Sequence, residues 1–137
     1  VPAGDLYTIT IEKPEASLAE GAVASQAQTV AVLSSDTMGS GDDTLGRLLM
    51  KGFLFALTQL DTPPAAVLLY NGGARLSVKG SASLDDLLAL AAAGTKRLTW
   101  GTCLQHFGIT DQLAGGEVTN RYSSVETMRD ADQSLRP

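Results

Sequence analysis

Residues 29–33 (TVAVL) and 65–70 (AAVLLY) are two short apolar runs, and residues 43–60 between them (DTLGRLLMKGFLFALTQL) carry apolar side chains at helical spacing. A short continuous apolar run is typical of a strand that is covered on both faces. Ser40 and Asp43 are spaced as a helix start signal. A strand, a helix and a second strand in this order predict a parallel pair joined by a crossover helix.

The same alternation continues toward the C-terminus. The pattern predicts a helix between Ser83 and Gly94, a strand over residues 96–100, a last helix around residues 122–128 and a weak strand over residues 132–136. We therefore expect an α/β domain at residues 29–137, with a mainly parallel sheet of about five strands in a three-layer α/β/α arrangement.

The N-terminal segment has a different character. Tyr7, Ile9 and Ile11 alternate with polar residues, as in a half-buried strand, whereas residues 14–28 mix small and polar types without a period. We interpret residues 1–13 as the last strand of a preceding domain, or an added edge strand, and residues 14–28 as a linker.

The helix predicted within residues 43–60 is apolar over much of its circumference. We assign its core face to Leu45, Leu49, Phe53 and Leu57. Met50 and Leu54 then extend the apolar surface beyond what one sheet covers, so we expect a homo-oligomer.

Composition excludes several classes of partner. The net charge is -5, and no run of Lys or Arg offers a nucleic-acid surface. No apolar stretch approaches the length of a membrane helix, and the N-terminus lacks a signal-peptide pattern. Cys103 is the single cysteine, which excludes an internal disulfide and fits a reducing, cytoplasmic location.

The carboxyl ends of parallel strands meet at one edge of a sheet, where ligands bind in open α/β folds. Three segments rich in small or hydrogen-bonding residues follow the predicted strands: Ser34-Ser35-Asp36, Asn71-Gly72-Gly73 and Gly101-Thr102-Cys103. We therefore place Cys103 in a pocket, with Asp36, Asn71, Gly72, Gly101 and Thr102 as substrate-binding candidates.

The position of Cys103 favours a reactive thiol. Thr102 as N-cap and Gln105 three residues later would form a capping box and place Cys103 in the first helical turn, where unpaired N–H groups favour a thiolate. His106, three residues on, is a candidate thiolate partner. The alternatives are a small buried cysteine and a solvent-exposed histidine that merely neighbours it.

The glycine-rich loop at residues 36–43 meets neither the Rossmann nor the P-loop spacing. Asp36, Asp42 and Asp43 match no metal-ligand spacing, and capping explains them better. We expect no metal and no cofactor.

Four motifs in order resemble a known family: residues 34–46 (SSDTMGSGDDTLG), 70–76 (YNGGARL), 101–104 (GTCL) and 116–120 (GEVTN). Together they look like the DsrE-like domain of YedF-type sulfurtransferase-like proteins, within the DsrE/DsrF-like family, which is associated with selenium metabolism. The resemblance covers residues 29–137. It implies a DsrE-like fold, a TusA-like domain ahead of it whose end is residues 1–13, and Cys103 near the acceptor cysteine of sulfur-relay relatives. The TusA-like Cys-Pro motif is absent.

The sequence thus leaves two functions open. One is a sulfur-relay domain, a sulfurtransferase that carries sulfane sulfur as a persulfide on Cys103 between a donor and an acceptor protein. The other is a non-catalytic module that binds a small ligand or a partner subunit at the same strand ends.

Overall fold

The computed structural model describes residues 28–137, so the predicted strand at residues 7–11, the domain remnant and nearly all of the linker lie outside the described residues. The strands are β1 (Thr29–Leu33), β2 (Ala66–Leu69), β3 (Lys96–Trp100), β4 (Glu117–Thr119) and β5 (Gln133–Leu135). The α-helices are α3 (Asp43–Thr58), α4 (Leu84–Ala92), α5 (Gly101–Phe107) and α6 (Arg121–Asp130), and two 3₁₀ helices are η1 (Asn71–Ser77) and η2 (Thr110–Gln112).

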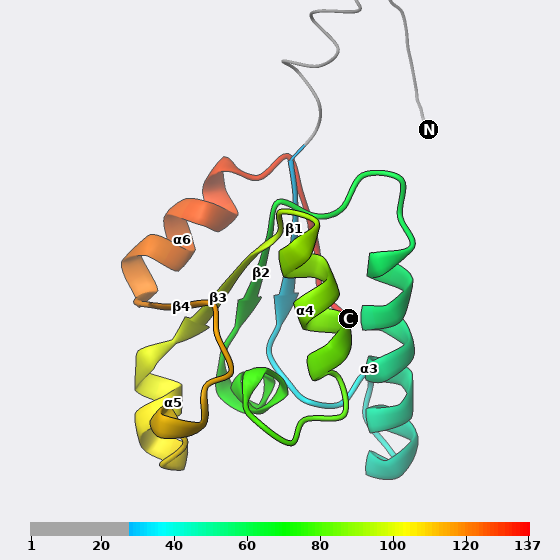
Figure 1. The fold of residues 1–137 in the computed structure, drawn as a ribbon, viewed down its shortest axis with the longest axis vertical. Helices are drawn as coiled ribbons and strands as arrows, with labels where there is room; N and C mark the ends of the chain where they lie inside the picture. Colours follow the sequence, from blue (N-terminus) through cyan, green and yellow to red (C-terminus); the bar gives the residue numbers. More distant parts are fainter. Residues whose placement is uncertain (1–27) are drawn as a thin grey trace, which may run out of the picture.

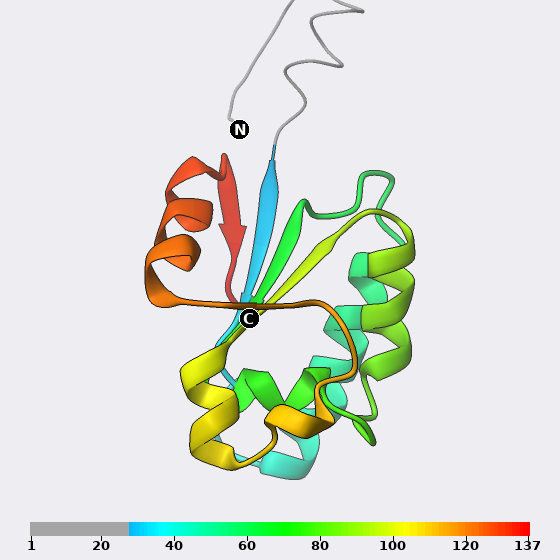
Figure 2. The same ribbon diagram turned by 60° about the vertical axis from the view of Figure 1, so that its left-hand side comes forward.

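All five strands are parallel and lie in the order β4-β3-β2-β1-β5. The chain moves outward from β1 to β4 and then returns across the sheet to β5, beside β1 (Figure 1). Because crossovers between parallel strands are right-handed, a reversal of direction puts the connecting helix on the opposite face. Helix α6 accordingly lies across the sheet from α3 and α4 (Figure 2). The predicted three-layer α/β/α architecture is confirmed, as is the short strand within residues 132–136.

Alternation along the strands separates two apolar cores. Ala31 and Leu33 of β1 point into the core beneath α3 and α4, whereas Val30 and Val32 point to the α6 face, where Met128 and Ala131 pack. All four residues of β2 are buried, as expected for a central strand with helices on both faces.

The core-face assignment for α3 is confirmed for Leu57, which is buried, and for Phe53, which packs against the core, but it is wrong for Leu45 and Leu49, which are exposed. The other buried residues of α3 are Gly46, Met50 and Leu54. The cause is the helix itself, which has apolar residues on two opposite sides, so periodicity gives no sign of which side meets the sheet. Asp42 is the N-cap of α3, since its side chain accepts a hydrogen bond from the Leu45 amide at 2.7 Å.

We predict that Leu54→Ala lowers the free energy of unfolding by about 2–5 kcal/mol, because Leu54 is fully buried and its truncation leaves a cavity. Leu45→Ala, at a leucine that is 51% exposed, should change it by less than about 0.5 kcal/mol in dilute solution. Urea denaturation followed by circular dichroism measures both. Similar losses in the two variants would contradict the orientation of α3.

Candidate functional site

The carboxyl edge of the sheet is held together at the carbonyl group of Leu33, the last residue of β1. The Tyr70 amide donates a hydrogen bond to this carbonyl oxygen at 3.1 Å. Gly73 lies so close to it that a Cβ at that position would overlap the oxygen, so a glycine is required there. Helix η1, which starts at Asn71, is therefore fixed beside the ends of β1 and β2.

Helix α5 begins where β3 ends, without a loop. Trp100 is both the last residue of β3 and the N-cap of α5, and its side chain makes no capping hydrogen bond. The predicted Thr102–Gln105 capping box is therefore wrong, because the N-cap is Trp100 and the helix starts two residues earlier than predicted, at Gly101. Cys103 is the third helical residue and remains in the first turn, as predicted, with its side chain half-buried.

The thiol of Cys103 is in contact with η1. The backbone N–H of Asn71 donates a hydrogen bond to Cys103 Sγ, with 3.0 Å between nitrogen and sulfur. Asn71 has a φ of 51°, in the left-handed region, where asparagine is tolerated better than most residues. In this conformation, at the start of η1, the backbone N–H of Asn71 points to the neighbouring helix α5.

A second contact joins the same two helices one turn further along. The Arg75 guanidinium lies over the Phe107 ring, 4.2 Å from its centroid. Arg75 follows Asn71 by four residues on η1, and Phe107 follows Cys103 by four residues on α5. The two contacts fix the register of η1 against α5 and bring a positive charge to the helix pair that holds the thiol.

Two aromatic rings pack at the carboxyl ends of the central strands. Tyr70 and Trp100, at the ends of β2 and β3, pack with ring centroids 5.0 Å apart. Gly101 passes close to the edge strand, since a Cβ there would come within 2.9 Å of Val118. A small residue is thus required where β3 turns into α5, and Thr102 beside it is exposed.

The loop after β1 completes the edge. A Cβ on Gly72 would lie 3.6 Å from Asp36 Oδ1, so Asp36 reaches the start of η1. The Ser35 hydroxyl accepts a hydrogen bond from the Thr37 amide at 3.0 Å and holds the turn that presents Asp36. The structure therefore brings the three predicted segments together at one edge, with Gly72 between Asp36 and Asn71.

His106 is exposed, and its ring meets the Phe107 ring edge-on with 5.3 Å between centroids. The hydrogen bond at Cys103 Sγ comes from Asn71. A role of His106 as thiolate partner stays a prediction.

Within residues 28–137, no three His, Cys, Asp or Glu side chains come close enough together to hold a metal ion. The described part of the chain also contains no helix of the length and hydropathy that a membrane span requires.

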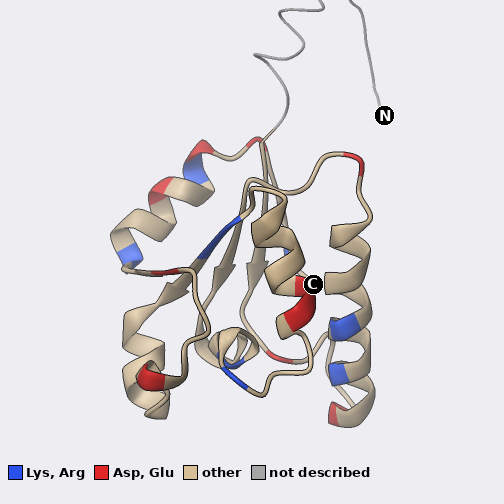
Figure 3. Ribbon diagram, viewed as in Figure 1, with Lys and Arg blue, Asp and Glu red and all other residues tan. Residues whose placement is uncertain are grey.

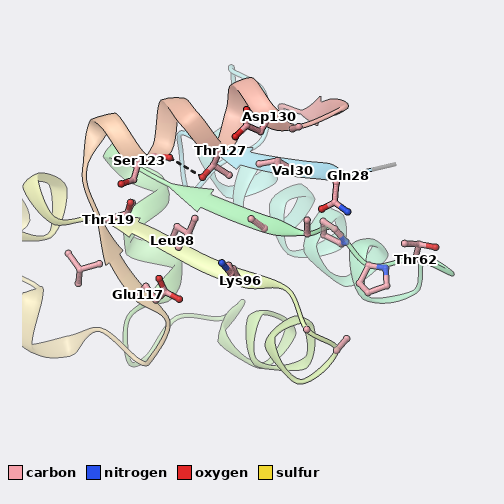
Figure 4. A pocket seen from close by; sticks show the side chains of 18 of the residues that line it. Gln28, Val30, Thr62, Lys96, Leu98, Glu117, Thr119, Ser123, Thr127 and Asp130 are labelled. Atoms are coloured by element: carbon pink, nitrogen blue, oxygen red, sulfur yellow. Dashed lines mark hydrogen bonds between the residues drawn. The ribbon is translucent and has the colours of Figure 1, made fainter. Parts of the chain in front are cut away.

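A separate groove of about 920 Å³ runs along the α6 face of the sheet. Val30 and Leu98 are apolar residues of the sheet that line the groove, and Lys96 and Glu117 are charged residues that line it. Figure 4 shows Ser123 and Thr127 of α6 above the strands, joined by the hydrogen bond from Thr127 Oγ1 to the Ser123 carbonyl. Cys103 does not line this groove, so the groove and the surroundings of the thiol are distinct surfaces of the domain.

Several features of the site are not evident from sequence reasoning. The Asn71-Gly72-Gly73 segment was predicted to follow a strand but not to be helical; it starts a 3₁₀ helix of seven residues, and this helix places Arg75 over the Phe107 ring. Strand β4 was also missed. It has three residues, too few for alternation to be recognised, although it lies within the 116–120 motif.

Comparison with known proteins supports the fold. No protein-family model and no curated protein matches the chain. Among solved structures, the YchN protein of E. coli has a TM-score of 0.62 and 15% identity, over 80% of this chain and 99% of that one. A protein of unknown function from Methanobacterium thermoautotrophicum has a TM-score of 0.60 and 18% identity, over 82% and 100%. A conserved protein of unknown function from Bacteroides thetaiotaomicron has a TM-score of 0.56 and 13% identity, over 80% and 95%.

The chain has a DsrE-like fold. At these identities the likeness concerns the fold, which confirms the predicted fold class. The YedF-type assignment and the preceding TusA-like domain stay predictions.

We predict that Asn71→Gly keeps the rate of Cys103 alkylation by iodoacetamide within about threefold of the parent, because glycine adopts the left-handed conformation and retains the amide. Asn71→Val should lower the free energy of unfolding by about 1–2 kcal/mol, since a β-branched residue is strained at a positive φ, and should change the alkylation rate more than Asn71→Gly does. Mass spectrometry follows the alkylation. Equal behaviour of the glycine and valine variants would show that the backbone of Asn71 does not determine the environment of the thiol.

Proposed function

We propose that this domain is a sulfur carrier that accepts sulfane sulfur on Cys103 as a persulfide and passes it to a second protein. The observation that supports the proposal is the hydrogen bond from the Asn71 amide to Cys103 Sγ at the carboxyl edge of a DsrE-like sheet. A backbone amide is a donor that cannot rotate away, and a hydrogen bond to an anionic acceptor is stronger than one to a neutral acceptor. The Asn71 amide is therefore a fixed hydrogen-bond donor to the sulfur of Cys103.

The reaction is an exchange between sulfur atoms. The Cys103 thiolate attacks the outer sulfur of a donor persulfide, a new S–S bond forms to Cys103, and the S–S bond within the donor breaks. The donor leaves as a thiolate, which takes up the proton that Cys103 released. No external oxidant or reductant is needed, since the sulfane sulfur keeps its oxidation state. Attack by an acceptor thiolate on the same outer sulfur completes the relay.

The surroundings of Cys103 suit such a cargo. The half-buried side chain leaves the sulfur open on one side, which a partner cysteine needs for access. Gly101 and Thr102 precede Cys103 in the first turn of α5, where backbone N–H groups lack helical partners and could bind the outer sulfur. Asp36 lies against Gly72, the residue that follows the Asn71 donor.

Selenium is a second cargo for the same thiol, supported by the resemblance to proteins associated with selenium metabolism. Donor and acceptor are expected to be cytoplasmic proteins, because Cys103 can accept sulfur only as a free thiol, and thiols are kept reduced in the cytoplasm.

The second candidate function is a non-catalytic module that binds a ligand or partner. The groove beside α6 favours it, because the groove is distinct from the cysteine and combines an apolar floor with Lys96 and Glu117 at its edge.

The test is incubation of the full chain with a persulfide donor, followed by intact-mass measurement. We expect Cys103 to gain the mass of one sulfur atom and to lose it when an acceptor thiol is added, and Cys103→Ser to gain nothing. A Cys103 that labels readily with iodoacetamide but takes up no sulfur would contradict the carrier function and favour the binding module.

A further inference from the structure

The two helices that hold the thiol carry one acidic or basic side chain between them. Arg75 is the only charged residue of η1, and α5 contains no Asp, Glu, Lys or Arg (Figure 3). The helix pair therefore presents a single guanidinium in a chain whose net charge is -5. Because a partner meets Cys103 across these two helices, the sign of this charge bears on which partners are accepted.

The guanidinium of Arg75 is held by its face and is free at its edge. It lies over the Phe107 ring, 4.2 Å from the centroid, and the residue is exposed. Stacking occupies the flat face of a guanidinium and leaves its in-plane N–H donors pointing outward, in the fork geometry that matches a carboxylate. Among residues 28–137, no carboxylate forms an ion pair with Arg75. An ordered side chain of this kind loses little rotamer entropy when a carboxylate binds to it.

The register of the two helices fixes how far this guanidinium is from the thiol. Arg75 follows Asn71, the donor to Cys103 Sγ, by four residues. Phe107 follows Cys103 by the same number of residues on α5. Four residues advance an α-helix by about 6 Å and a 3₁₀ helix by about 8 Å. A carboxylate that reaches Arg75 is therefore about two residues from the reacting sulfur in an extended chain, or about one turn from it in a helix.

The other end of the site carries the opposite charge. Asp36 lies against Gly72, the residue after the Asn71 donor, and within the described part of the chain it forms no ion pair. A carboxylate at this end repels an anionic group of a partner. A partner with one acidic side chain near its sulfur is therefore oriented with that side chain toward Arg75.

We propose that the protein with which Cys103 exchanges sulfur carries an acidic side chain close to its own reactive cysteine, and that this carboxylate binds Arg75. The inference rests on the proposed sulfur-carrier function for the nature of the exchange, whereas the recognition step requires only that Cys103 reacts with a cysteine of the partner. An exposed ion pair changes a rate by about 1.5- to fivefold. The effect decreases with salt, because the Debye length falls to about 3 Å at 1 M.

The test uses two blocked pentapeptides whose cysteine is activated as a 2-pyridyl disulfide and is followed, two positions later, by aspartate or by asparagine. The Cys103 thiolate attacks the peptide sulfur, a disulfide forms between the chain and the peptide, and pyridine-2-thione leaves. Its absorbance gives the rate, which is divided by the rate of each peptide with 2-mercaptoethanol. The measurements are made on the full chain at pH 8, where histidine in general carries little charge.

We expect the parent chain to react about two- to fivefold faster with the aspartate peptide than with the asparagine peptide at low ionic strength, and equally fast with both in 1 M salt. Arg75→Met removes the charge and should abolish the preference. Its rate with the asparagine peptide should stay within about twofold of the parent, which separates recognition from a structural effect on the thiol. Circular dichroism checks that the variant is folded.

Arg129→Met is the matched control, because it changes the net charge of the chain by the same amount. Arg129 lies in the last turn of α6, and Asp132, three residues later, accepts a hydrogen bond from the Gln28 amide at the start of β1. The control is therefore at the amino edge of the sheet, opposite Cys103, and should keep the preference of the parent.

Equal normalised rates of the two peptides with the parent, or an unchanged preference in Arg75→Met, would overturn the proposal. Failure of the carrier function has a different result. The chain would then distinguish the two peptides through Arg75 but would take up no sulfur from a persulfide donor.

Discussion

The carbonyl oxygen of Leu33 is the point on which the geometry of the candidate site depends. It accepts the Tyr70 amide and lies against the backbone of Gly73, so the end of β1 fixes where η1 begins. Because η1 begins there, the Asn71 amide faces α5 and reaches Cys103 Sγ. The position of the thiol relative to its donor is thus set by contacts between backbones, which substitutions of exposed side chains leave in place.

The parallel sheet makes this arrangement possible. Strand β2 is buried on both faces and lies between parallel neighbours, so the carboxyl ends of the strands lie at the same edge. The three connections that follow β1, β2 and β3 therefore start at this edge. Two of these connections, η1 and α5, lie side by side and are joined both by the thiol hydrogen bond and by the Arg75–Phe107 contact. At this edge Tyr70 and Trp100 pack against each other, Asp36 is half-buried, and Thr102 is exposed to solvent.

The sequence predicts the layers and the edge well, because burial on both faces and alternation of strands with helices are recorded in local composition. It predicts the orientation of α3 poorly, since Leu45 and Met50 are equally apolar and only the packed domain distinguishes them. The start of α5 was predicted too late in the sequence because Thr102 has the chemistry of an N-cap. In the structure the strand continues directly into the helix, and Trp100 is the N-cap. Contacts between elements, such as that of Asn71 with Cys103, join residues far apart in sequence and have no local signature.

Amide hydrogen exchange at Asn71, measured by NMR on the full chain, tests most directly whether the backbone of η1 holds the thiol. Replacement of Cys103 by alanine removes the sulfur acceptor, and the loss of one hydrogen bond of about 1 kcal/mol should speed exchange at Asn71 roughly fivefold. The Gly73 amide, which donates to the Tyr70 carbonyl instead, should exchange at an unchanged rate. An Asn71 amide that exchanges equally in the parent and in Cys103→Ala would contradict the account.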